Sequence, residues 1–144
     1  MSKFSVSRET VKGRDELWAV LADYPNIADW TSGLTSSHAT SAETSGVGAR
    51  RHCDLTSGGT LEETVRHWDE GRELAISIDE ATKVPLKSAV STFTIVESPN
   101  GHTITMATEF TPKGGPVGRL IGPLLKPLLR KGNSGLLEEW ESAA

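Results

Sequence analysis

Apolar residues recur at spacings of three and four between residues 116 and 140. This spacing places them on one side of an α-helix, in a stripe wide enough to cover part of a sheet. The members of the stripe are Val117, Leu120, Ile121, Leu124, Leu125, Leu128 and Leu129. We therefore predict a long terminal helix that buries this stripe against a sheet. A charge introduced at Leu124 is then expected to unfold the domain, because it would be buried without a partner.

Two prolines interrupt this predicted helix. Pro123 and Pro127 each remove an internal hydrogen bond and crowd the carbonyl group four residues earlier. We therefore predict a kink, or a restart of the helix, between Gly122 and Pro127.

The remainder of the chain carries strand, turn and short-helix patterns. Alternation predicts a first strand at 4–11, and helical spacing predicts helices at 14–22 and 25–30. Six further strands are predicted at 34–43, 49–56, 60–68, 72–79, 88–97 and 102–111. The predicted fold class is α+β, a single domain over residues 1–144 in which a curved antiparallel sheet wraps around the terminal helix. A single helix cannot fill a strongly curved sheet, so a pocket is expected between the two.

The turn at 100–101 predicts which side chains of the last two strands share a face. Asn-Gly is a strong signal for a two-residue hairpin turn. Such a turn would place Ile95 opposite Met106 and Phe93 opposite Thr108. This face is apolar, so we expect it to point inward.

The loop at 69–72 predicts the pairing of two central strands in the same way. It would place His67 opposite Leu74 and Glu63 opposite Ile78. Because the apolar members of these pairs must be buried, Glu63 and His67 are expected on the inner face as well. Trp68 would then face outward.

The strand at 49–56 allows two orientations. The glycine turn at 58–59 would direct inward the set Arg50, His52 and Asp54. The more apolar set is Ala49, Cys53 and Leu55. A bulge would reconcile the two patterns, and the sequence leaves the inward face open.

Composition and charge exclude several classes of function. The chain has 144 residues, 36% of them hydrophobic, and a net charge of −4, with no long basic run, which disfavours nucleic-acid binding. The apolar run in the terminal helix is too short, and the helix carries too many charges, for stable membrane insertion. The N-terminus has no signal-peptide pattern, so a cytoplasmic location is expected. The single cysteine cannot form an internal disulfide. The four histidines are scattered without metal-ligand spacing, so we expect neither a metal site nor a cofactor.

A carboxylate and an imidazole among aliphatic side chains form the candidate chemistry of this pocket. Residues two apart on a strand lie about 6–7 Å apart on one face, so polar side chains gathered there suit acid–base catalysis or the orientation of a polar ligand end. Solvated or structurally paired side chains at the pocket mouth are the alternative. The predicted ligand-binding residues are Trp30, Leu61, Glu63, Val65, His67, Ile76, Ser91, Phe93, Ile95, Met106, Thr108 and Leu124.

The sequence resembles the polyketide cyclase/dehydrase and lipid-transport family of the START-like, or birch-pollen-allergen-like, helix-grip superfamily (SRPBCC). The resemblance lies in the segments LADYPNIADW, GVGARRHCDL, GGTLEETVRHWDEGRELAISI, TEFTPKGG and VGRLIGPLLKPLLRK. It implies a ligand pocket lined by the inward residues of the strands that match Leu61 to His67 and Ile104 to Phe110. It also implies that His67 stands where aromatase/cyclase members use a catalytic arginine. Their pocket tryptophans correspond to Leu61, Glu63, Phe93 and Met106, and these differences count against aromatase/cyclase activity.

Three functions remain open at this stage. The first is a binding protein for a small apolar molecule, which is lipid-, aromatic- or polyketide-like. The second is a cyclase- or dehydratase-type enzyme that uses the same pocket, and the third is a regulatory module that binds a protein partner. The sequence also leaves open whether the protein forms a homodimer.

Overall fold

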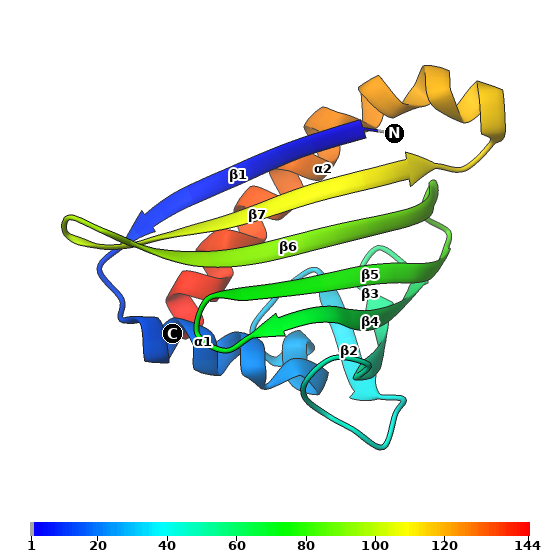
Figure 1. Cartoon of the computed structure of the whole chain (residues 1–144). Helices are drawn as coiled ribbons and strands as arrows, with labels where there is room; N and C mark the ends of the chain where they lie inside the picture. The colour runs from blue at the N-terminus through cyan, green and yellow to red at the C-terminus, as the bar shows by residue number, and fades with distance from the viewer. Residues whose placement is uncertain (1) are drawn as a thin grey trace.

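A seven-stranded antiparallel sheet crossed by one long helix dominates the structure, a computed structural model that describes residues 2–144 (Figure 1). The strand order is β1-β7-β6-β5-β4-β3-β2. The strands are β1 (Ser2–Thr10), β2 (Leu34–Ala39), β3 (Arg50–Leu55), β4 (Thr60–Asp69), β5 (Glu73–Thr82), β6 (Leu86–Ser98) and β7 (Gly101–Pro112). The helices are α1 (Arg14–Ala22), the 3₁₀ helix η1 (Tyr24–Asp29) and α2 (Gly115–Ala143). The predicted fold class and element order are confirmed.

The β6–β7 hairpin is displaced by two residues from the predicted pairing. Ser98 pairs with Gly101, so Phe93 lies opposite Met106 and Ile95 opposite Ile104. A shift of two residues preserves the face of every side chain, because the strand period is two. The predicted inner face of these strands is therefore correct although the pairs are not.

A bulge in β4 changes the face of two predicted residues. The pairing of β4 with β5 shifts between Val65 and His67, which leaves one residue of β4 without an opposite partner. Beyond the bulge the side chains swap faces. Trp68 therefore packs against Trp18, with ring centroids 5.2 Å apart, and does not face outward as predicted. His67 is 53% exposed in its side chain, and its Nε2 lies 3.1 Å from Glu73 Oε2.

Most of the predicted stripe of helix α2 is not buried, although Leu125 and Leu129 pack partly against the core. Five residues of the predicted stripe are exposed, namely Val117, Leu120, Ile121, Leu124 and Leu128. The fully buried side chains of α2 lie in its second half, where Leu137 and Trp140 join the core beneath the sheet. The exposed position of Leu124, at 76%, removes the reason to expect unfolding from a charge there.

The shape of α2 follows from its prolines and glycines. One continuous helix includes both Pro123 and Pro127, so the helix does not restart. Figure 1 shows the helix axis changing direction along the orange half, which contains these prolines. Gly118 and Gly122 are the buried residues of this half. Because glycine has no side chain, the helix backbone can approach the end of β7 closely at these two positions.

We expect Gly118→Ala to destabilise the fold by about 1–3 kcal/mol, because an added Cβ would be forced against backbone. The ideal position of a Cβ atom on residue 118 lies 2.2 Å from the Lys113 carbonyl oxygen. Gly122→Ala is the matched control, since a Cβ there has ordinary contacts of 3.4 Å or more. The control should be neutral, or more stable by up to about 1 kcal/mol because alanine favours helix. Urea denaturation of both variants measures the difference, and equal effects would show that the close approach is not limiting.

Candidate functional site

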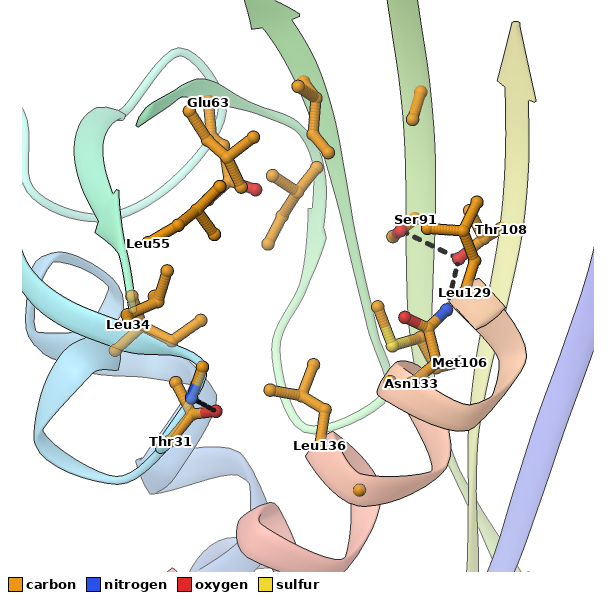
Figure 2. A pocket seen from close by; sticks show the side chains of 18 of the residues that line it. Thr31, Leu34, Leu55, Glu63, Ser91, Met106, Thr108, Leu129, Asn133 and Leu136 are labelled. Atoms are coloured by element: carbon orange, nitrogen blue, oxygen red, sulfur yellow. Dashed lines mark hydrogen bonds between the residues drawn. The ribbon is translucent and has the colours of Figure 1, made fainter. Parts of the chain in front are cut away.

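A cavity of about 700 Å³ lies between the concave face of the sheet and the second half of α2 (Figure 2). Its walls come from β2 to β7, from η1 with the loop that follows it, and from α2. Most of its lining is apolar, including Leu34, Leu55 and Leu136, which Figure 2 shows facing the open space. A curved sheet leaves such a space because one helix cannot contact both of its ends.

Seven of the predicted ligand-binding residues line this cavity. They are Leu61, Glu63, Ile76, Ser91, Phe93, Met106 and Thr108. All are carried by β4 to β7, where alternation identified the inner face from the sequence.

The other five predicted residues lie elsewhere. Val65 and Ile95 are inward but belong to the packed core near α1. Trp30 lines a separate small void below η1. His67 is turned outward by the bulge in β4, and Leu124 is exposed on the far side of α2. Neither His67 nor Leu124 is among the residues lining the cavity.

An ion pair stands in the wall made by β3 and β4. Arg51 Nε donates to Glu63 Oε1 at 2.7 Å, and these side chains are only 4% and 11% exposed. The guanidinium also donates to the carbonyl oxygen of Tyr24 at 2.8 Å and lies 4.0 Å from the centroid of its ring. Arg51 thereby joins η1 to the sheet and holds the carboxylate of Glu63 in place.

The orientation of β3 is what brings Arg51 to this position. Ala49, Arg51 and Cys53 are buried, so the odd-numbered residues face inward. The sequence did not decide which face of this strand points inward. One of the two alternatives had Arg50, rather than Arg51, as the inward arginine. The pairing of Arg51 with Glu63 across β3 and β4 supplies the charge that a buried arginine needs.

Burial and charge set the protonation of this group. Burial acts to lower the pKa of Arg51, but the interactions of its guanidinium, with the Glu63 carboxylate foremost among them, together raise it. Burial raises the pKa of the Cys53 thiol, and Glu63 raises it further. Cys53 is therefore a neutral thiol, and it donates a hydrogen bond of 3.4 Å to Glu63 Oε1. A thiol held in this form is a poor nucleophile.

A second polar group lies across the cavity from Glu63. Ser91 and Thr108 share a hydrogen bond of 2.9 Å, and Asn133 Nδ2 of α2 donates to Thr108 Oγ1 at 2.9 Å. Figure 2 shows the amide oxygen of Asn133 pointing toward the middle of the cavity. Sequence reasoning identified Ser91 and Thr108 but missed Asn133, because it lies beyond the predicted stripe of the helix.

Glu139 closes the end of the cavity near η1. Its carboxylate accepts from the Thr31 hydroxyl at 2.9 Å and from the Ser32 amide at 2.8 Å. Burial acts to raise the pKa of Glu139, but these hydrogen bonds prevail and the pKa is lowered. Glu139 therefore remains ionised and ties the loop after η1 to α2.

These polar groups suit the recognition of a ligand better than an acid–base reaction. The bonds from Arg51 and Cys53 both end on Glu63 Oε1, so Oε2 of the same carboxylate can accept from a hydroxyl group in the cavity.

Across residues 2–144 no three metal-ligating side chains gather at one point. Within the same residues no helix is long and apolar enough to cross a membrane.

The architecture is that of a START-like helix-grip protein, in which a curved sheet and a C-terminal helix enclose an apolar cavity. The chain matches the sequence model of the family described as polyketide cyclase/dehydrase and lipid transport over residues 1–141, and it belongs to that family. A search of curated protein sequences found no match.

Solved structures show the same fold at low sequence identity. XoxI from Bacillus cereus superposes with a TM-score of 0.76 at 21% identity, covering 99% of this chain and 95% of that one. A START superfamily protein from Mycobacterium smegmatis gives 0.79 at 14% identity, covering 97% and 94%. StfQ, a di-domain aromatase/cyclase from the steffimycin biosynthetic pathway, gives 0.81 at 12% identity, covering 99% of this chain and 50% of StfQ.

Proposed function

We propose that this protein binds a small, largely apolar molecule in the cavity between the sheet and α2. The observation that carries the proposal is the cavity itself, about 700 Å³ with mostly apolar walls and a few clusters of polar groups. Ligand pockets typically have a volume of about 300–1,000 Å³, apolar walls and a few placed polar groups. The family description, which includes lipid transport, is consistent with this class of ligand.

The polar groups define the kind of ligand further. Glu63 offers a carboxylate oxygen as an acceptor, and Asn133 offers an amide oxygen on the opposite wall. A flat or chain-like apolar body that carries a hydroxyl group at one end, or at both, would satisfy these acceptors. We therefore propose a hydroxylated aromatic, polyketide-like or lipid-like ligand.

Binding is favoured over catalysis in this cavity. The Glu63 carboxylate is held by Arg51, Cys53 is a neutral thiol, and His67 lies outside the cavity. A general base must take a proton from the ligand, and one oxygen of the Glu63 carboxylate is already engaged by Arg51 and Cys53. The relation to StfQ, an aromatase/cyclase, supports the ligand class rather than the reaction.

We expect Met106→Trp to weaken the binding of 1-hydroxypyrene and pyrene by at least about tenfold, because the indole would occupy space that the ligand needs. Met106 lines the cavity. The control is Val96→Trp, which adds the same group at an exposed position on the opposite face of the sheet. Fluorescence titration of both variants measures the effect. Unchanged affinity in Met106→Trp would place the binding site elsewhere.

The same probes test the role of Glu63. Glu63→Gln should weaken 1-hydroxypyrene more than pyrene, by about tenfold, since a hydrogen bond to a charged acceptor is worth about 1.5–3 kcal/mol. Native mass spectrometry of the purified protein would show directly whether a ligand is retained. Equal losses for both probes would remove Glu63 from ligand recognition.

A further inference from the structure

The first half of α2 carries an apolar surface that the fold does not use. Val117, Leu120, Ile121, Leu124 and Leu128 lie on one side of the helix, at spacings of three and four, and all are exposed. Leu120 and Leu124 are 77% and 76% exposed. We call these five residues the leucine stripe. Contiguous apolar surface of this kind marks a site of contact with another molecule or with a membrane.

The charge around the leucine stripe is of one sign. Between Glu109 and Glu138 the chain holds five basic residues and no acidic one. The rest of the chain holds the other ten basic and all nineteen acidic residues. The basic residues of this segment are Lys113, Arg119, Lys126, Arg130 and Lys131. A positively charged end on a negatively charged protein indicates a partner surface that is anionic.

The position of the leucine stripe connects it with the cavity. Figure 1 shows the orange half of α2 lying beyond the end of the sheet, while the red half runs across the sheet toward α1. Leu128, the last member of the stripe, also lines the cavity, as does Lys131 one turn later. The stripe and the cavity wall therefore meet at this turn of the helix.

We propose that the leucine stripe docks the protein on the surface of an anionic lipid bilayer. A helix with an exposed apolar side and flanking basic residues lies in the interface of a membrane, with its apolar side chains among the acyl chains. The basic side chains meet anionic headgroups, and Arg119 and Lys87 also line a surface groove of about 680 Å³ beside the start of α2. No membrane-spanning segment is needed for this mode of contact.

Charge favours a bilayer over a second copy of the chain. Two copies joined stripe to stripe about a two-fold axis would bring the same basic residues together. Such like-charge contact is unfavourable, whereas an anionic bilayer neutralises it. Docking also explains how a cavity for an apolar molecule could exchange its contents with a phase that dissolves them, an interpretation that rests on the proposed function.

Sedimentation with phosphatidylcholine vesicles, with and without phosphatidylserine, tests the proposal. The wild-type protein should bind the phosphatidylserine vesicles more strongly, and added salt should weaken this binding. The double variant Leu120→Ser/Leu124→Ser should lose about tenfold or more in vesicle affinity. Arg119→Gln/Lys126→Gln should lose about tenfold. Both should bind pyrene in vesicle-free buffer as the wild type does.

Matched controls separate the stripe from general surface effects. Val11→Ser/Val96→Ser removes two exposed apolar side chains elsewhere, and Arg50→Gln/Arg72→Gln removes two exposed charges elsewhere. Neither control should change vesicle affinity, and a loss equal to that of the stripe variants would overturn the proposal.

Two other measurements distinguish the remaining outcomes. Absence of vesicle binding by a wild-type protein that still binds pyrene would refute the docking proposal alone. Absence of pyrene binding would refute the proposed function, while vesicle binding is judged on its own result. Light scattering of the wild type and of Leu120→Ser/Leu124→Ser gives the oligomeric state. A wild-type dimer that becomes monomeric in the variant, without vesicle binding, would replace the bilayer by a second copy.

Discussion

Trp140→Ala is expected to destabilise the protein by about 3–5 kcal/mol, the range for removing a large aromatic side chain from a core. Trp140 has 0% exposure and is among the largest fully buried side chains. Its indole nitrogen donates to the Leu17 carbonyl oxygen at 2.9 Å, and its ring packs edge-on against Phe93, with centroids 5.8 Å apart. The substitution would leave a void where α2, α1 and the sheet meet, and would remove a buried hydrogen bond.

Leu124→Ala is the control for Trp140→Ala, since it truncates an apolar side chain on the same helix at an exposed position. It should change the free energy of unfolding by no more than about 0.5 kcal/mol. Urea denaturation measures the free energy of unfolding of both variants. Unfolding is monitored by circular dichroism and not by fluorescence, because the loss of a tryptophan alters the fluorescence signal. Comparable losses would mean that the first half of α2 contributes to the core in solution.

Glu63→Leu is expected to cost about 3–5 kcal/mol, because it leaves the Arg51 guanidinium buried without its counter-ion. Arg51 is 4% exposed, and an arginine cannot lose its proton to escape this cost. The reverse change, Arg51→Met, should cost less, since a carboxyl group at the cavity wall can take up a proton. The two halves of one ion pair should therefore contribute unequally.

The double variant Arg51→Met/Glu63→Leu completes a thermodynamic cycle. Replacing a buried ion pair by apolar side chains is often neutral or stabilising, so the double variant should recover most of the loss of Glu63→Leu. The free energies of unfolding of the four proteins, from urea denaturation, give the coupling directly. Additive losses would indicate that the ion pair is solvated by the cavity and does not contribute to the fold.

Local patterns were sufficient for the element order and for most of the inner sheet face. Helix α1 has the predicted bounds, and Phe93 and Met106 face inward although the predicted pairing was displaced by two residues. Strand alternation has a period of two, so a displacement by an even number leaves each side chain on its face. The resemblance to a family then identified the class of fold, which the matched family model confirms.

The leucine stripe shows where local patterns were insufficient. Periodicity correctly predicted a helix with an apolar side, but it could not specify which side meets the sheet. The glycines Gly118 and Gly122 allow close approach to the end of β7 and so turn the leucines toward solvent. The side of a helix that is buried depends on the shape of its neighbour as well as on its own hydrophobicity.

What the sequence by itself determined is therefore the order of the elements, the inward face of β5 to β7 and the existence of a pocket. Only the tertiary structure decided which charged side chains accompany Glu63 in that pocket. A single unpaired residue in β4 turned His67 outward, and the pairing of β3 with β4 brought Arg51 to Glu63. Both outcomes depend on how one strand pairs with its neighbour, and a shift of one residue there reverses every side chain beyond it.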